Sequence, residues 1–491
     1  MSAAPASSPV NGERLFAPER RSILLALMSI VAIASYNNLS ATAALPDIGD
    51  DLGGISLLPF VITISLLTSA VAILASGPVV DGFGARQTFR IAAVGFLATS
   101  LLVAASPTMT LLLVARAAQG IFSGMIMTVA MASIGLAIPE KLRPRAFALT
   151  SSVWGVVGVA GPALAALLVA TVGWRGIFVV NVPVTALAAI IGWNRIPARP
   201  DGAERQAFDR VGLALIAVLT TGALALASAQ LSIIAVAGVV VVTTTTVYVW
   251  WAGRIPDPVV RIPHVLDPRY RVVHLTSMAV LAGGVGADAF LPLYLRTVRG
   301  QSASIAAFGV LFLTIGWTGS AYVASRLQDR WAGEWVALLG SLIATSAAFA
   351  TALAIAVDAP LVLVYGVFVW FGSGVGMVTS TGSALLQSRT RVTEMGRLNG
   401  AHQFLRTIAL TFGIAVVGAV TLAIVDRRTG DVEIVRKVLG GETVATSADV
   451  LDAIGDGYTI AILIVAAAVT ASIPGAIRLV RTRNQPLVSA T

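Results

Sequence analysis

The sequence predicts an all-α integral membrane protein of about fourteen transmembrane helices, with two six-helix bundles and two helices inserted between them. Hydrophobic residues make up 57% of the 491 residues and charged residues only 12%, a composition unlike that of soluble domains. Apolar runs of about 20 residues recur from residue 22 onward, and each is long enough to cross the hydrocarbon as a helix. Segments of strictly alternating polarity are absent, which disfavours a β-barrel.

The apolar runs place the fourteen helices in order along the chain. Their centres are expected near residues 33, 67, 97, 123, 156, 184, 219, 241, 284, 314, 346, 375, 411 and 468. The expected regions are a cytoplasmic tail 1–21, an N-terminal bundle 22–194, linkers with two inserted helices 195–271, a C-terminal bundle 272–482 containing an outside loop 426–456, and a tail 483–491. No cleavage site follows the first apolar run, so a retained first helix is expected.

The two halves of the sequence repeat one pattern, which is typical of transporters. Leu45-Pro46 is expected to end the first helix of one half, and Asp81 to follow its second helix. Leu291-Pro292 and Asp329 are expected in the same places in the other half. The two Pro-to-Asp spacings are 35 and 37 residues.

The placement of Lys and Arg predicts the orientation. With the N-terminus in the cytoplasm, inside segments carry 24 of the 33 basic residues and outside segments carry 7. Positive charge on cytoplasmic loops is the usual rule, so both termini are expected in the cytoplasm. This distribution explains the net charge of +9 without a nucleic acid partner.

A loop pattern after the second helix points to a cytoplasmic gate. Its residues in this chain are Gly77, Asp81, Gly84 and Arg86. Glycines allow a sharp turn against a neighbour, and an Asp can bind helix N-terminal amides. The pattern resembles the loop signature of the major facilitator superfamily, although Gly82 and Ala85 stand where basic residues are usual. A second, degenerate copy is Asp329-Arg330.

Arg116 and Gln119 lie three residues apart inside the fourth apolar run and therefore share a helix face. They resemble the helix-4 signature of the same superfamily, which places both in the transport path. The alternative is that Arg116 extends outward to the membrane surface.

The fifth apolar run contains Gly158, Gly161 and Pro162. Small residues let helices approach closely and proline bends a helix. The run resembles the glycine-rich helix of superfamily antiporters, with Ala165 and Ala166 in place of two glycines. Ordinary helix packing is the alternative interpretation.

Trp174, Arg175, Asn181 and Pro183 follow that helix. Their spacing closely resembles a motif of the fourteen-helix drug:proton antiporters, and the resemblance extends from about residue 22 to 480. It implies a major facilitator fold and export, and it leaves the substrate unspecified.

The resemblance breaks at the residue nine positions before Pro46, where these antiporters carry Asp and this chain has Asn37. Asparagine does not titrate. Asp288, the only carboxylate deep in an apolar run, is the first replacement candidate for proton coupling. The alternatives are that Asp288 pairs with Arg116 or Arg406, or lies near the outer surface.

His402 is the second candidate for proton coupling, and the alternative for it is a helix-terminus position. The remaining residues expected along the transport path are Asn38, Gln403 and Arg406.

The predicted function is export of small amphipathic, drug-like molecules across the cytoplasmic membrane by alternating access, coupled to protons. The alternatives are export of a lipid, siderophore or other metabolite, and a facilitator without proton coupling. No enzyme constellation, cofactor motif or metal-ligand spacing is present. The expected partners are substrate, protons and lipid, and the protein is expected to be a monomer.

The orientation can be tested because the chain has no cysteine. A cysteine replacing Ser447 should react with an impermeant maleimide added to intact cells, because 426–456 is expected outside. A cysteine replacing Ser489 should react only after permeabilisation, and the reverse pattern would contradict the predicted topology.

Overall fold

The structure is a computed structural model and describes residues 15–54, 57–199, 209–225, 231–429 and 448–483. Within these ranges the regular structure is entirely helical. Most of the predicted tails 1–21 and 483–491 and of the loop 426–456 lies outside the described residues.

The helices of the first part of the chain follow one another with short connections. They are α1 Pro18–Ser40, α2 Leu45–Leu52, α3 Leu58–Phe83, α4 Ala85–Ala104, α5 Met109–Ala137, α6 Arg143–Val172, α7 Arg175–Val179 and α8 Asn181–Gly192. Short 3₁₀ turns, η1 Ala41–Ala44 and η3 Glu140–Leu142, precede α2 and α6.

The rest of the chain contains the inserted pair and a second group of long helices. They are α9 Arg210–Ala225, α10 Leu231–Ala252, α11 Ile262–Leu266, α12 Pro268–Thr297, α13 Ala303–Leu327, α14 Gly333–Ala356, α15 Leu361–Ser388, α16 Met395–Thr429, α18 Ala448–Thr470 and α19 Ser472–Thr482. The 3₁₀ turn η4 Val392–Glu394 leads into α16.

Twelve of the described helical segments are long and apolar enough to cross a membrane. Every expected helix centre lies within a helix, but α1 and α9 are not among the twelve. The described part of α9 has 16 residues, and α1 carries charged and amide side chains at its ends. The multi-pass architecture is therefore confirmed, and the count of fourteen spans stays a prediction.

Several predicted helix boundaries were wrong. Leu45-Pro46 begins α2 instead of ending a helix, because proline is well suited to the first turn. Pro292 lies inside α12, which continues to Thr297. Asp81 belongs to the last turn of α3, and the ends of the predicted loop 426–456 are helical in α16 and α18.

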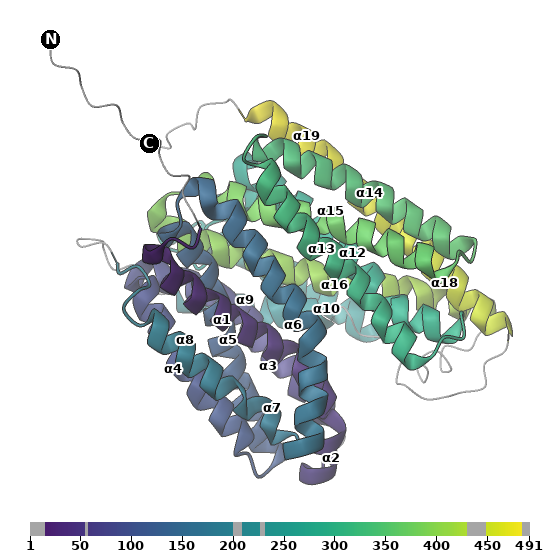
Figure 1. Cartoon of the computed structure of the whole chain (residues 1–491), viewed down its shortest axis with the longest axis horizontal. Coiled ribbons are helices and arrows are strands. Elements are labelled where there is room, and N and C mark those ends of the chain that lie inside the picture. The colour runs from purple at the N-terminus through teal and green to yellow at the C-terminus, as the bar shows by residue number, and fades with distance from the viewer. Residues whose placement is uncertain (1–14, 55–56, 200–208, 226–230, 430–447, 484–491) are drawn as a thin grey trace.

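Two hydrophobic cores correspond to the two groups of helices. One is built almost entirely from α1 to α8 and the other from α12 to α18. Figure 1 shows the groups side by side: they meet at the upper left of the view and diverge toward α2 and α18. We call the end where they meet the arginine-rich end, because it carries Arg86, Arg145, Arg261, Arg330 and Arg389.

The inserted helices α9 and α10 pack against the seam between the two groups. A small core joins Ile216 and Tyr248 of this pair to Ile73 of α3 and Phe404 of α16. Asp209, just before α9, accepts hydrogen bonds from Trp251 Nε1 at 3.0 Å and from the Val259 amide at 3.2 Å. The pair therefore lies outside the central interface between the groups.

Candidate functional site

A cavity of about 290 Å³ lies between the two helix groups. Its walls come from α5 and α6 on one side and from α13, α15 and α16 on the other. Apolar walls carry a few polar groups, which is the usual character of a small-molecule site. The polar and aromatic lining residues are Phe147, Thr150, Ser151, Trp154, Thr314, Trp317, Thr318, Thr379, Ser380, Ser383, Gln403 and Arg406.

At the arginine-rich end, Asp81 joins the two groups. Its carboxylate accepts hydrogen bonds from the backbone amides of Gly396 at 2.6 Å and Arg397 at 2.9 Å. These amides belong to the first turn of α16, where helix amides lack internal partners and the helix dipole favours a negative charge. Asp81 therefore does bind the N-terminus of a helix, and that helix belongs to the other group.

Glycines make this approach possible. A Cβ at Gly77 would lie 2.8 Å from the Arg397 Cα, and a Cβ at Gly396 would lie 2.5 Å from the Gly77 carbonyl oxygen. Gly84 has a φ of +87° and a Cβ there would lie 2.8 Å from the Arg199 Cβ, so it both turns the chain and admits the linker. The predicted need for glycine at positions 77 and 84 has a direct steric basis.

A second contact between the groups repeats the first at the matching place. Asp329, just after α13, forms an ion pair of 2.7 Å with Arg145 in the first turn of α6. Arg86 instead donates from Nε to the Ile196 carbonyl at 2.8 Å within its own group. Arg330 is exposed and takes part in neither contact.

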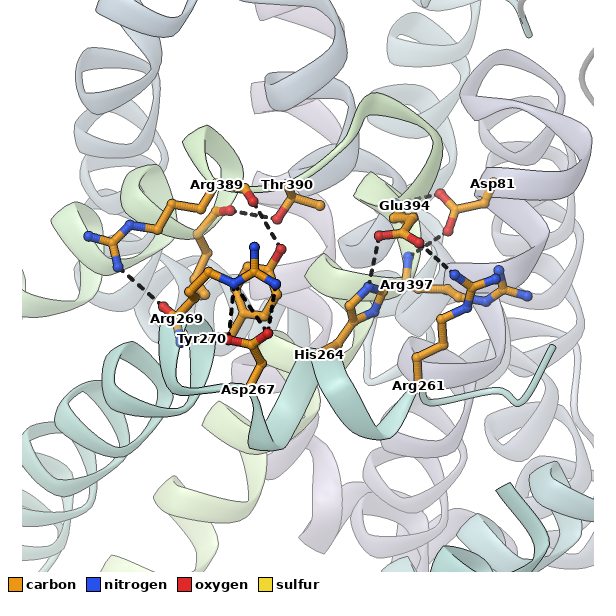
Figure 2. Close-up of polar contacts among 12 residues, drawn as sticks. Asp81, Arg261, His264, Asp267, Arg269, Tyr270, Arg389, Thr390, Glu394 and Arg397 are labelled. Atoms are coloured by element: carbon orange, nitrogen blue, oxygen red, sulfur yellow. Dashed lines mark hydrogen bonds and ion pairs between the residues drawn. The ribbon is translucent and has the colours of Figure 1, made fainter. Parts of the chain in front are cut away.

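The arginine-rich end also carries a cluster that the sequence analysis missed (Figure 2). Glu394 accepts from Arg261 at 2.5 Å and lies 3.2 Å from His264 Nε2. Arg397 lies 3.6 Å from Asp257. The cluster ties the linker before α12 to the start of α16. No local sequence signal could have located it, because about 130 residues separate Glu394 from Arg261 and His264.

Arg116 is buried in a polar network inside the first group. It is 1% exposed, and it donates to Val61 O at 3.0 Å, Asn37 Oδ1 at 3.3 Å and Gln119 Oε1 at 2.7 Å. Arg116 therefore does not extend to the surface, which excludes that alternative. The side chain of Asn38 lies outside the described part of the structure.

Asn181 extends the same network, because its Nδ2 lies 3.4 Å from Asn37 Oδ1. Trp174 and Arg175 instead hold the opposite end of the bundle. Both donate to Asp51 Oδ2, at 3.0 and 2.5 Å, and these hydrogen bonds keep the pKa of Asp51 below its usual range. Pro183 lies in the first turn of α8.

Gly158 and Gly161 are less constrained than the sequence suggested. A Cβ at either position would meet only ordinary contacts, at 3.8 and 3.5 Å, whereas one at Gly155 would lie 2.3 Å from Thr318 Oγ1. Gly155 is therefore the glycine of α6 at which a side chain would collide with α13. Pro162 lies inside α6, and Gly158 lines the cavity.

Asp288 is 8% exposed within α12. Its Oδ1 has no hydrogen-bond partner, and no ion pair joins it to Arg116 or Arg406 among the described residues. The alternative of an arginine partner is therefore not supported. Asp288 does not belong to the residues that line the cavity.

His402 is part of a buried histidine pair beside the cavity. Its Nδ1 lies 3.1 Å from Nδ1 of His274, and its Nε2 lies 3.5 Å from the hydroxyl of Ser383, a cavity residue. His274 Nε2 lies 2.9 Å from the carbonyl oxygen of His264. The fold thus brings together histidines that the sequence separates by 128 residues. Among the described residues, no cluster has the three ligands that a metal ion would need.

Gln403 and Arg406 both line the cavity. They lie three residues apart on α16 and therefore share a face. The structure thus separates the predicted path residues into two sets: Arg116, Gln119 and Asn37 form a network inside the first group, and only Gln403 and Arg406 line the cavity.

The arrangement of two helix groups around a cavity, with paired contacts at one end, is typical of a membrane transporter. The sequence matches the model of the Major Facilitator Superfamily over residues 25–414. The chain therefore belongs to the major facilitator superfamily, whose members are transporters and not enzymes.

Relatives and solved structures agree with this assignment. An uncharacterised MFS-type transporter of Mycobacterium tuberculosis is 27% identical over 87% of this chain, and the chain spans 64% of the length of that relative. The multidrug transporter protein MdtP of Bacillus subtilis is 23% identical, over 82% of this chain and 75% of its own length. A bacterial homologue of the iron transporter ferroportin, solved in an outward-facing state, has a TM-score of 0.63 at 13% identity and covers 94% of this chain and 99% of its own.

The Asp81 contact can be tested through the conformational equilibrium. Asp81→Asn replaces one acceptor oxygen by a donor, so a buried amide loses its partner at a cost of about 1–3 kcal/mol. A single cysteine at Thr379 in the cavity should then react several-fold faster with an impermeant maleimide supplied at the arginine-rich end.

Asp329→Asn is the matched control, since its ion pair is partly exposed and such pairs contribute about 0–1 kcal/mol. It should change the labelling rate much less. Equal rates in wild type and Asp81→Asn would show that the contact does not hold this end closed.

Proposed function

We propose that the protein is a secondary active transporter that exports small amphipathic molecules across the cytoplasmic membrane by alternating access. The observation that carries this proposal is the cavity between two helix groups whose specific contacts gather at one end. Besides the Asp81 and Asp329 contacts, Gln387 Nε2 donates to the Met131 carbonyl at 2.8 Å across the interface. One further hydrogen bond, from Thr318 Oγ1 to the Ser151 carbonyl at 3.3 Å, crosses the interface beside the cavity. The contacts at the arginine-rich end can break while each group keeps its own core.

The arginine-rich end is the cytoplasmic side in this proposal, because positive loops remain in the cytoplasm. The described conformation is then closed toward the cytoplasm. Substrate enters the cavity when the Asp81 and Asp329 contacts break, and leaves after they form again. Each group moves as a body, since the two hydrophobic cores do not need to be rebuilt.

Export is favoured over import by relatives whose names describe multidrug transport or efflux, including MdtP. Lipid, siderophore or metabolite export uses the same geometry and differs only in the cargo. A facilitator without proton coupling is the second candidate function. The observation that favours it is Asn37, which places a neutral amide 3.3 Å from Arg116 Nη1.

Proton coupling, in this proposal, belongs to the His274 and His402 pair. A carbonyl oxygen can only accept, so His274 Nε2 must carry the hydrogen that faces His264 O. In the neutral pair, His274 Nδ1 therefore accepts from the Nδ1–H of His402. This leaves the Nε2 lone pair of His402 facing Ser383 and the cavity, where it can take up a proton.

The pair accommodates one added proton and not two, because two positive imidazoles 3.1 Å apart would repel each other strongly. The proton would therefore be exchanged with the cavity in single steps. Asp288 remains the second coupling candidate, as a buried carboxyl whose Oδ1 has no partner. Its position outside the cavity lining makes it less able to respond to substrate.

Export can be tested in proteoliposomes with 8-anilinonaphthalene-1-sulfonate and ethidium as separate fluorescent probes. An imposed pH gradient should drive accumulation of at least one probe above that in protein-free vesicles. Gly158→Trp should abolish this accumulation, because the new side chain would fill part of a cavity of about 290 Å³. Accumulation that is unchanged in Gly158→Trp would show that substrate does not pass through this cavity.

Coupling can be tested by comparing His402→Gln with Asp288→Asn. His402→Gln should lose accumulation driven by the pH gradient but keep exchange of probe between equal compartments. His264→Gln is the matched control and should keep coupling, because His274 contacts only its backbone carbonyl. Coupling kept by His402→Gln but lost in Asp288→Asn would move the proton site to Asp288, and coupling kept by both would favour another driving force.

A further inference from the structure

We infer that the central cavity selects amphipathic organic anions, and that Arg406 with Gln403 binds their acidic group. This inference rests on the proposed function, because it assigns a substrate class to the same cavity. Its basis is a difference between the two arginines that lie within the membrane-spanning part of the chain. The described part of the chain provides hydrogen-bond acceptors for the guanidinium of Arg116 and none for that of Arg406.

Arg116 is the arginine whose donors the fold uses. Its guanidinium donates to three oxygens and lies 5.4 Å from the ring of Phe178. Arg406 instead lines the cavity, and no hydrogen bond or ion pair holds its guanidinium within the described part of the chain. A guanidinium at membrane depth is costly unless something binds it. The substrate is the partner that this geometry leaves for it.

The other lining groups reinforce this preference. No Asp or Glu lines the cavity, so the described walls hold no countercharge for a cationic drug. Among the described lining residues only Arg406 has a permanent charge. His402, which contacts the lining residue Ser383, and its neighbour His274 carry either no charge or a positive one. The electrostatic potential of the cavity therefore favours an anion at every protonation state of the pair.

Gln403 places a second hydrogen-bond donor beside Arg406 on the same helix face. The hydroxyls of five lining residues already donate to backbone carbonyls one turn earlier: Thr150, Ser151, Thr379, Ser380 and Ser383. The Gln403 amide has no such partner in the described structure and lies three residues before Arg406 on the same face. Together they offer a planar fork and an amide, which suit a carboxylate or sulfonate.

Trp154 and Trp317 supply the apolar part of the site. Their rings, with Met127, Met131 and Leu410, match a flat aromatic body. The cavity volume of about 290 Å³ is near the lower limit for small-molecule sites, so a ligand of one or two rings is favoured. Tryptophan rings also attract cations, but Arg406 opposes any cation in this cavity.

The test uses three compounds with the same naphthalene ring and a negative, neutral or positive substituent: naphthalene-2-carboxylate, naphthalene-2-methanol and naphthalen-2-ylmethylammonium. Binding to purified full-length protein is measured by calorimetry in detergent, without any gradient. The carboxylate should bind about 10- to 100-fold more tightly than the ammonium, the range expected for a charge-assisted contact. Equal or tighter binding of the ammonium would overturn the inference.

Substitutions then assign the preference to Arg406. Arg406→Gln should weaken carboxylate binding about 10-fold or more and change methanol binding little. Arg406→Lys should keep part of the preference, because it keeps the charge and loses the fork. Gln403→Glu should reduce the preference by placing a carboxylate beside Arg406. Arg296→Gln, at an exposed position on α12, is the matched control and should behave like wild type.

The outcomes separate this inference from the proposed function. Carboxylate binding that depends on Arg406, in a protein that moves no probe across vesicles, would support the anion site and contradict the export proposal. Probe transport by a protein that binds none of the three naphthalenes, or binds them without regard to charge, would support export and overturn the anion site. A preference that persists in Arg406→Gln would also overturn it.

Discussion

The interior of a membrane protein must provide a partner for every polar group at membrane depth, because hydrocarbon provides none. This constraint explains why Arg116, Gln119 and Asn37 form one network, and why His274 and His402 face each other at 3.1 Å. It also makes exceptions informative. Among the charged side chains at that depth in the described part of the chain, Arg406 and Asp288 Oδ1 are such exceptions, and only Arg406 lies where a molecule in the cavity can reach it.

The same need for partners governs the contact between the two helix groups. The amides at the start of α16 have no partners within their own helix, and Asp81 of the other group supplies them. Because each of the two carboxylate oxygens accepts one hydrogen bond, the contact is either formed or broken, without an intermediate arrangement. That property suits a two-state equilibrium in which a substrate shifts populations through its different affinity for the two states.

Charge in the cavity links substrate and driving force. A proton on the His274 and His402 pair would strengthen anion binding near Arg406, and by reciprocity an anion would strengthen proton binding. This mutual strengthening favours movement of anion and proton together, so exchange in opposite directions requires that the two bind in different conformations of the protein. The membrane potential acts separately: an inside-negative potential favours outward movement of an anion by about 2.3 kcal/mol per charge per 100 mV.

Apolar run length was enough to place a helix at each of fourteen expected centres, because a membrane-spanning helix is a local property of about 20 residues. Local spacing also placed Arg116 and Gln119 on one face, and the loop pattern indicated that Asp81 could bind helix amides. Helix ends at Pro46 and Pro292 were misplaced, since proline alone does not decide whether neighbouring helices complete the backbone hydrogen bonds. Which helix Asp81 binds, the pairing of His274 with His402, and the difference between Arg116 and Arg406 depend on residues far apart in the chain. Only the tertiary structure decided these three features, because a contact between distant segments produces no periodic pattern in a single sequence.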